Sequence, residues 1–184
     1  MAKQIMINPM REIKLEKVVL NIGGVAEKLD KGFILLEKLS GKKPIRVKAT
    51  KRIPIWNVRP GLEVGTKVTL RGEEAIEMVR KLLPAIDNVL KEKQIQPNCF
   101  SFGIHEYIEI PGVEYIREVG IMGFEVTVVF SRAGKVVEKK KINGGKARRL
   151  TVTREEIENY VVSKFGTEIL RKAKKGSEEE DDSE

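Results

Sequence analysis

The sequence predicts an α+β fold in which an antiparallel or mixed β-sheet carries helices on one face. Two observations lead to this prediction. Segments in which apolar and polar residues alternate, as they do in half-buried strands, are separated by short turns that contain glycine and proline. Other segments repeat their apolar residues at helical spacing, and such helices need an apolar surface to pack against.

The alternating segments are the expected strands. We expect strands at residues 13–23, 44–49, 64–71, 102–110 and 124–130. In the second of these, Ile45 and Val47 point to one face, while Arg46 and Lys48 point to the other. The first strand is rich in β-branched residues and ends at a pair of glycines, which indicates a turn.

The helical segments carry recognisable start and stop signals. We expect helices at residues 27–41, 72–92 and 153–166. Gly41 ends the first helix, and Pro84 should kink the second. The third opens with a capping box formed by Thr153 and Glu156, and it closes at Gly166.

Together these elements predict a two-layer sandwich of the RRM-like or ferredoxin-like kind. If the apolar strand faces pack on the helices, the opposite sheet face is polar and net positive. We expect that face to gather Asn21, Arg46, Lys48, Lys67, Thr69 and Arg71. Such a face can lie on a phosphate backbone, but it can also be an ordinary hydrated surface. The strand residues alone leave both interpretations open.

The charge balance points to a polyanionic partner. The chain of 184 residues has a net charge of +8, and leaving out its last seven residues, six of which are acidic, raises that charge to +14. Such a surplus favours binding to nucleic acid or to an anionic membrane, although a merely soluble basic surface is an alternative. We expect one domain over residues 1–166, and a charged tail over residues 167–184 that ends in a disordered acidic stretch.

Cysteine usage and hydropathy predict a cytoplasmic protein. Cys99 is the single cysteine, so no internal disulfide can form, and a lone thiol suits a reducing compartment. No apolar run approaches the roughly 20 residues that a membrane span needs, and the first residues do not resemble a signal peptide.

The residues needed for catalysis are missing. His105 is the single histidine, and a strand would point His105 and Glu106 to opposite faces. The stretch at 143–149, "NGGKARR", lacks the spaced first glycine and the Ser/Thr of a phosphate-binding loop. We therefore expect no catalytic residues, no metal site and no cofactor.

Two basic segments stand out. Residues 42–62 hold seven basic residues, no acid and the single tryptophan, Trp56, which lies between two prolines. A tryptophan usually lies in a core, but here it can also sit on a projecting loop, over residues 50–62, that packs on RNA. The second basic segment, residues 131–150, contains glycines and a single acid, Glu138.

Several longer stretches of the sequence resemble a known family. The stretches "NPMREIKLEKVVLNIG", "LLEKLSGKKPIRVKA", "VRPGLEVGTKVTLRGEEA", "FSFGIHEYIEIPGVEY" and "VGIMGFEVTV" follow in the order and spacing of the universal 5S-rRNA-binding protein of the large ribosomal subunit. This family is counted fifth in bacterial and archaeal naming and eleventh in eukaryotic naming. The resemblance covers roughly residues 8–166. The "NPMRE" start, the basic segment and the "RPG" loop resemble the archaeal type.

The resemblance implies a non-enzymatic structural protein of the ribosome, in the cytoplasm. Its partners would be 5S rRNA and large-subunit rRNA in the central protuberance, peptidyl-site tRNA, and neighbouring ribosomal proteins. In the family, 5S rRNA meets residues that correspond to Asn21, Lys42 and Thr69. Lys42 replaces a frequent glutamine, so its contact would be one of charge.

From the resemblance and the basic residues together we expect three groups of contacts. The rRNA-binding residues are Asn21, Lys42, Lys43, Arg46, Lys48, Lys67, Thr69 and Arg71. The loop that reaches tRNA in the family corresponds to residues 50–62, with contacts from Lys51, Arg52, Ile55, Trp56, Asn57 and Arg59. Further basic RNA contacts are Lys139, Lys140, Lys141, Lys146, Arg148 and Arg149.

One departure from the family concerns the loop. The family often has Phe-Gly where this sequence has Trp56-Asn57, and glycine allows backbone angles that asparagine adopts less readily. Two other functions are held beside the ribosomal one. An RNA-processing enzyme would need a catalytic pair that the sequence does not offer, and a general nucleic-acid chaperone would be indifferent to the identity of its RNA.

Overall fold

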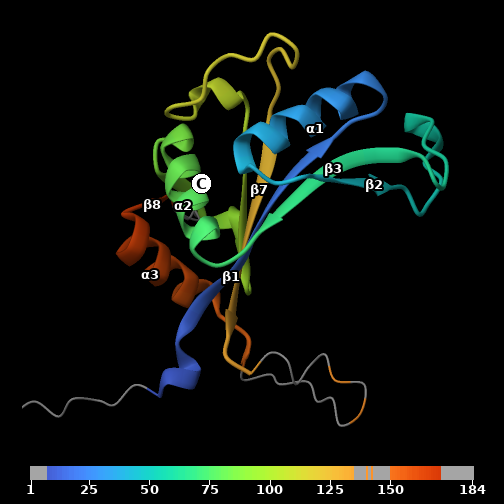
Figure 1. The fold of residues 1–184 in the computed structure, drawn as a ribbon. Coiled ribbons are helices and arrows are strands. Elements are labelled where there is room, and N and C mark those ends of the chain that lie inside the picture. The colour runs from blue at the N-terminus through green and yellow to red at the C-terminus, as the bar shows by residue number, and fades with distance from the viewer. Residues whose placement is uncertain (1–7, 135–139, 141, 143–149, 171–184) are drawn as a thin grey trace, which may run out of the picture.

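The computed structural model describes residues 8–134, 140, 142 and 150–170 (Figure 1). One antiparallel sheet has the strand order β2-β3-β1-β7-β6-β5. Its strands are β2 (Ile45–Lys48), β3 (Glu63–Leu70), β1 (Ile13–Gly23), β7 (Phe124–Arg132), β6 (Cys99–Ile104) and β5 (Ile95–Gln96). The predicted α+β class is confirmed, and the first strand has the predicted bounds.

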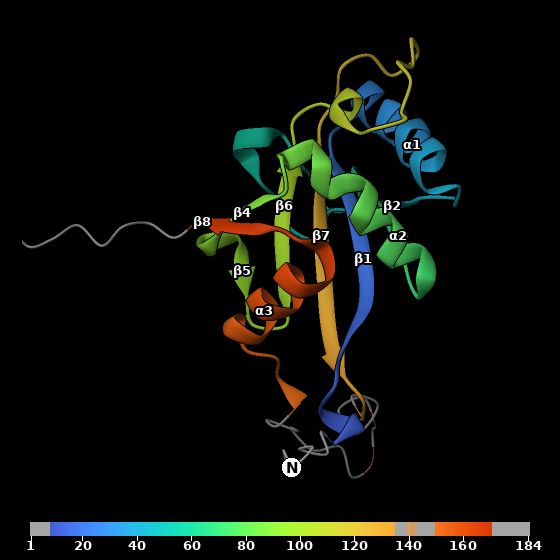
Figure 2. The same cartoon turned by 90° about the vertical axis from the view of Figure 1, so that its left-hand side faces the viewer.

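Three α-helices cover one face of this sheet (Figures 1 and 2). They are α1 (Glu27–Ser40), α2 (Glu73–Leu82) and α3 (Arg154–Phe165). Val18, Leu20 and Ile22 of β1 are almost fully buried beneath them. Alternation along β1 therefore places the side chains of Val19 and Asn21 on the uncovered face. The predicted two-layer arrangement is confirmed.

Close packing fixes α1 on the centre of the sheet. A Cβ atom built on Gly32 would lie 2.9 Å from Cγ2 of Ile22, so only a glycine lets the helix approach this closely. The helix then ends as predicted, because Gly41 adopts a left-handed conformation with φ 64° and its N–H donates to the carbonyl of Glu37. The chain is thereby turned into β2.

The second predicted helix is wrong at its C-terminal end. The α-helix stops at Leu82, and a 3-10 turn (Leu83–Ile86) containing Pro84 follows instead of a kinked continuation. Proline lacks the N–H that the next helical turn needs. Asp87 and Asn88 then take left-handed conformations, and the chain enters β4 (Val89–Lys91).

The predicted strand at 102–110 is also wrong in its bounds. Strand β6 ends at Ile104, and a 3-10 turn (Tyr107–Glu109) follows it. The strand stops where two backbones meet closely, since a Cβ on Gly123 would lie 2.5 Å from the carbonyl oxygen of His105. Beyond this point Tyr107 is buried, and its hydroxyl accepts the N–H of Ile116 at 2.8 Å.

The fold extends past the expected domain boundary at residue 166. Thr167 is buried, and β8 (Glu168–Leu170) pairs in parallel with β4. The acidic stretch at the end of the chain lies outside the described residues, as does most of the basic segment 131–150.

Helix α3 begins with the predicted capping box. The side chain of Glu156 accepts the N–H of Thr153 at 3.0 Å, and the hydroxyl of Thr153 accepts the N–H of Glu156. Arg132 of β7 also binds this carboxylate, which ties the helix to the sheet. The backbone N–H of Thr153 and, to a lesser degree, Arg132 lower the pKa of Glu156, although partial burial opposes them.

We predict that Glu156→Gln destabilises the fold at neutral pH by less than about 1 kcal/mol, because the carboxylate is partly exposed. A carboxyl whose pKa is lowered by folding contributes stability above its unfolded-state pKa, and this contribution is lost as pH falls through the folded-state pKa. Urea unfolding should therefore give a lower free energy of unfolding for the variant than for the original chain at pH 7. This difference should disappear near pH 3. Glu155→Gln, one residue earlier, is the control. An equal loss in both variants would contradict the prediction.

Candidate nucleic-acid interface

The uncovered face of the sheet brings together three of the predicted RNA-binding residues. Asn21 of β1 lies opposite Lys67 of β3, and Val19 lies opposite Thr69. Directly opposed residues of antiparallel strands share a face, so Lys67 and Thr69 lie beside Asn21 on the side away from the helices. Lys67 and Thr69 are exposed, and Asn21 is half-buried. The expected placement of these three residues is confirmed.

The same face continues across β7 and β6 with mostly small side chains. Thr127 lies opposite Val19, and Ser101 lies opposite Thr127. Glu125 lies opposite Asn21, and Gly103 follows it in the same row. These positions were not among the predicted RNA-binding residues, although Ser101 alternates with buried Phe100 and Phe102. Across β7 and β6 these rows carry small side chains and one acid, Glu125, and small side chains let a ligand backbone approach the sheet closely.

The prediction that Arg46 and Lys48 share this face is wrong. Arg46 lies opposite Thr66, which is fully buried on the helix side. Its guanidinium donates to Asp30 of α1 at 2.7 Å and to Glu63 at 3.0 Å. Residues two apart on a strand share a face, so Lys48 also points to the helix side. The apolar residue Ile45 is the one on the uncovered face, 65% exposed, opposite Lys67.

The inversion has a physical reason. Strand β2 lies at the edge of the sheet and reaches α1 at one end of that helix, so its apolar residues find little to pack against. Arg46, which lies near two carboxylates and an aromatic ring, is a more favourable partner for the helix than an apolar residue of β2 would be. The guanidinium lies 5.6 Å from the ring centroid of Phe33. Its hydrogen bond to Glu63 is the main cause that raises the pKa of Arg46; desolvation opposes this, and the charges of both carboxylates raise the pKa further.

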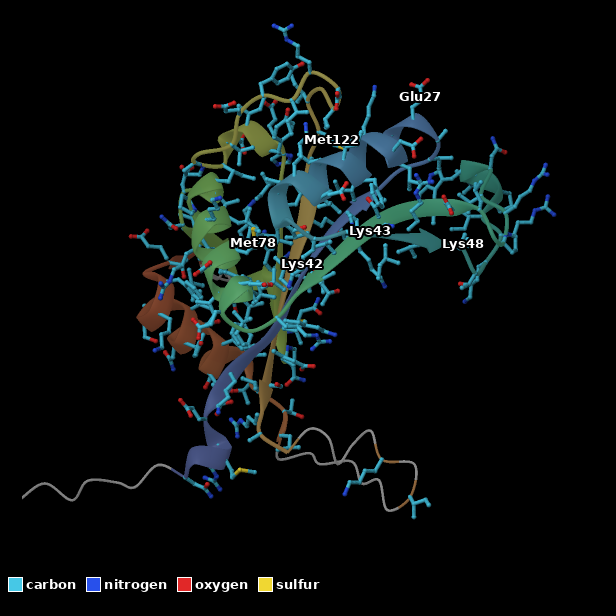
Figure 3. The ribbon with its side chains drawn as sticks, viewed as in Figure 1. Glu27, Lys42, Lys43, Lys48, Met78 and Met122 are labelled. Carbon is cyan, nitrogen blue, oxygen red and sulfur yellow. The ribbon has the colours of Figure 1, made fainter. Side chains whose placement is uncertain are left out.

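The remaining predicted rRNA-binding residues surround the sheet. Lys42 and Lys43 follow α1, and both are exposed (Figure 3). Lys42 forms an ion pair with Glu74 in the first turn of α2, whereas Lys43 makes none within the described residues. Arg71 follows β3, and its Nη1 lies 3.9 Å from a carboxylate oxygen of Glu16. Lys43 is therefore the more available of the two lysines.

The loop between β2 and β3 projects beyond the helices (Figure 1). It is a small hairpin, since Ile53 and Val58 exchange backbone hydrogen bonds of 3.0 and 3.1 Å. At its tip Trp56 is 71% exposed and Ile55 is 88% exposed, so Trp56 does not belong to the core. Asn57 adopts a left-handed conformation with φ 52°, which asparagine tolerates better than most residues. Asparagine thus serves where the family often has glycine.

Cations flank this tip. Lys51, Arg52 and Arg59 are exposed, and none of them forms an ion pair within the described part of the chain. Exposed apolar and aromatic side chains between unpaired cations are the combination that binds nucleic-acid backbones and bases. Of the predicted contacts in the basic segment, only Lys140 is described, and it is exposed; Lys139, Lys141, Lys146, Arg148 and Arg149 lie outside the described residues.

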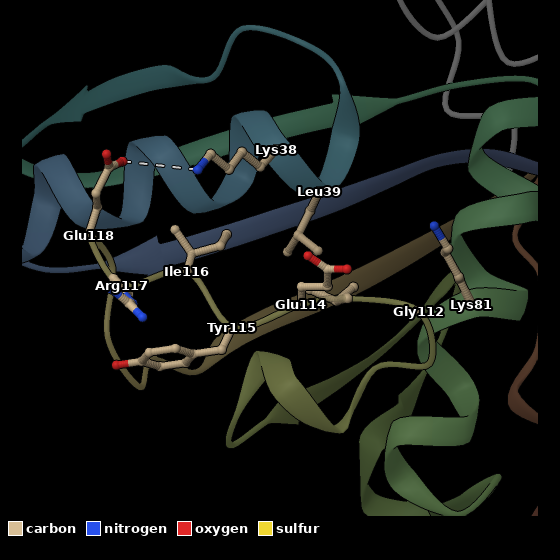
Figure 4. Close-up of a pocket in the computed structure, with 10 residues that line it drawn as sticks. Lys38, Leu39, Lys81, Gly112, Glu114, Tyr115, Ile116, Arg117 and Glu118 are labelled. Carbon is tan, nitrogen blue, oxygen red and sulfur yellow. Dashed lines mark ion pairs between the residues drawn. The ribbon is translucent and has the colours of Figure 1, made fainter.

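Other features offer less for RNA. A pocket of about 560 Å³ lies between α1, α2 and residues 112–118, and an ion pair of 4.0 Å joins Lys38 to Glu118 across its edge (Figure 4). Its lining mixes three cations with two carboxylates, Glu114 and Glu118, so its net positive charge is small. Within the described ranges no cluster of three potential metal ligands occurs, and no helix there has the length and apolar character to span a bilayer.

We predict that Arg46→Ala loosens β2 and the loop it carries, because the strand loses its contacts to α1. Amide hydrogen exchange at residues 45–48 should become faster in this variant. Lys43→Ala, an exposed change in the same segment, should leave the exchange rates as they were. Equal rates in both variants would show that Arg46 does not anchor the strand.

Two family models match most of the chain. Residues 8–59 match the family described as ribosomal protein L5, and residues 63–166 match the model of the C-terminus of the same ribosomal family. The chain is 44% identical to the large ribosomal subunit protein uL5 of Nanoarchaeum equitans, with 90% of this chain and 100% of that protein covered. It is 40% identical to uL5 of Archaeoglobus fulgidus (85% and 89% covered) and 38% identical to uL5 of Sulfolobus acidocaldarius (89% and 94% covered). The chain therefore belongs to the ribosomal protein L5 (uL5) family.

Proposed function

We propose that this protein holds 5S rRNA on the uncovered face of its sheet and contacts peptidyl-site tRNA with loop 50–62. Membership of the family makes it a structural, non-enzymatic component of the large ribosomal subunit, working in the cytoplasm within the ribosome. The observation that carries the 5S proposal is the adjacency of Asn21, Lys67 and Thr69 on the uncovered face of the sheet.

The chemistry of this face suits an RNA backbone. Lys67 offers a cation without an ion pair in the described part of the chain, and Thr69 and Asn21 offer hydrogen bonds to phosphate or ribose. Lys43 and Arg71 extend the positive charge along the edge. Because the strands are bonded to one another along their length, these groups keep fixed spacings, and RNA of matching shape is favoured over RNA in general.

The tRNA contact rests on the loop. Trp56 and Ile55 are exposed at its tip, and Lys51, Arg52 and Arg59 surround them. A tRNA surface offers both phosphates and base or ribose faces to such a group. We extend the proposal to large-subunit rRNA, through the basic segment 131–150, and to neighbouring ribosomal proteins. The domain predicted over residues 1–166, extended by β8, would act as one rRNA-binding domain.

A competition assay separates this function from that of a general nucleic-acid chaperone. The protein is titrated onto 5S rRNA at near-physiological salt with a large excess of unrelated structured RNA. Retained tight binding supports specific recognition. Binding abolished by the competitor would leave only the electrostatic attraction that any basic protein has for RNA.

We predict that Lys67→Ala weakens 5S rRNA binding by on the order of 1 kcal/mol, which is about fivefold, if one phosphate contact is lost. Arg71→Ala should give a similar loss. The slope of log K against log salt should also fall by about one unit in each variant. The control is Lys31→Ala, which removes the same charge from an exposed position on α1. Unchanged affinity in both test variants would count against the sheet face as the binding surface.

We predict that Trp56→Ala leaves 5S affinity intact and lowers tRNA occupancy of the peptidyl site in reconstituted large subunits. The reason is that the exposed indole belongs to the loop and not to the sheet face or the core. Tyr115→Ala removes another exposed aromatic side chain and serves as the control. Equal tRNA occupancy in the two variants would argue against a tRNA contact by the tip, whereas a large loss of folding stability would show that Trp56 supports the fold.

A further inference from the structure

A groove of about 620 Å³ lies between the turn after β1 and the base of loop 50–62. Val25 of the turn forms part of one wall, and Ile53 and Trp56 of the loop belong to the other. A Cβ on Gly23 would meet nothing within 4 Å, so there is free space at the turn side of the groove. The groove therefore lies at the end of the sheet, between the turn and the loop.

The walls of the groove are apolar and accessible. Val25 is 45% exposed, Ile53 is 37% exposed and Trp56 is 71% exposed, while Val58 is buried at the groove. Apolar side chains that remain this exposed around one concave site are typical of a surface that a ligand covers. A flat apolar group would fit beside the indole ring.

The charge at the groove is positive. Lys48 and Lys51 belong to its lining. Two carboxylates on this side of β2, Asp30 and Glu63, share one cation, Arg46, so half of their negative charge is balanced and the two lysines exceed the rest. A ligand that carries an anion next to a flat apolar body therefore matches both properties of the groove.

We propose that this groove receives one unpaired nucleotide of the tRNA contacted by loop 50–62, with its base against Trp56 and its phosphate near Lys48 and Lys51. The inference rests on the proposed tRNA contact and adds the chemistry of recognition to it. A nucleotide combines the required flat body and anion in one unit, and bases stack on aromatic side chains when they are not paired. A paired base inside a duplex cannot enter, because its faces are already stacked.

The single tryptophan makes the test direct. The fluorescence of Trp56 in the full chain is recorded while a single-stranded tetraribonucleotide is added, up to millimolar concentration. Saturable quenching is expected. An RNA duplex of the same sequence, and inorganic polyphosphate of equal charge, should quench at least about fivefold less. Equal quenching by all three probes, or none by the single strand, would overturn the proposal.

A groove-filling variant isolates the site. Ala49→Leu places a larger side chain in the groove without changing any charge. It should abolish quenching by the tetraribonucleotide and lower tRNA affinity of reconstituted large subunits about tenfold, while 5S rRNA affinity stays the same. The control is Ala133→Leu, which makes the same change in size directly after the last residue of β7 and outside the groove. If Ala49→Leu does not fold, Val25→Phe serves the same purpose from the other wall.

The outcomes distinguish the groove from the loop. If Ala49→Leu binds the single strand and tRNA as the original chain does, the groove is not the site, even when Trp56→Ala still lowers tRNA occupancy and so leaves the loop contact standing. If both variants leave tRNA binding unchanged, the proposed tRNA function fails together with this inference. If the Trp56 fluorescence changes with an apolar acidic peptide but not with the single-stranded RNA, the groove binds a protein segment. That result would overturn the proposal of a bound nucleotide.

Discussion

The structure depends first on the pairing of β1 with β3 on one side and with β7 on the other. This central strand carries Val18, Leu20 and Ile22 beneath the helices and Asn21 on the opposite face. Because strand side chains alternate, a slip of one residue would expose the core and bury Asn21 and its polar neighbours. The same packing that stabilises the fold therefore also decides which residues face the solvent as a binding surface.

A second set of interactions positions the loop. Arg46 ties the edge strand to α1 through Asp30, Glu63 and the ring of Phe33. The arginine also balances one of the two negative charges close to the basic loop. Arg46 would thus support the proposed RNA contact indirectly, because it lowers the opposing charge and holds the edge strand that carries the hairpin. The groove beside the hairpin depends on this placement, since one of its walls belongs to the loop.

Much of the fold followed from the sequence because the relevant signals are local. The alternation in residues 13–23, the glycine that ends α1 and the capping box of α3 each act within a few residues. The end of β6 did not follow, since it depends on where Gly123 meets the backbone of His105. The end of α2 did not follow because a proline can either kink a helix or end it, and Pro84 ends this one. The side of the sheet to which Arg46 points was predicted wrongly for a related reason. Alternation shows that Ile45 and Arg46 point apart, but only the position of α1 decides which of them is covered. For the candidate site, Asn21, Lys67 and Thr69 could be placed because they lie on strands covered by helices over much of their length, whereas the groove joins segments that the sequence separates.

The hairpin at the loop tip lowers the conformational entropy that the loop would lose on binding a ligand. Ile53 and Val58 bond to each other, and a second closure joins Ala49 to Leu62 and Gly61 by backbone hydrogen bonds of 2.8 and 2.9 Å. The loop backbone is thereby held in one shape before any ligand arrives, so little conformational entropy remains to be lost on contact. A contact of this kind can be weak in total and still be geometrically selective, and it can form and break without a folding step. That behaviour suits a surface whose ligand must be exchanged repeatedly.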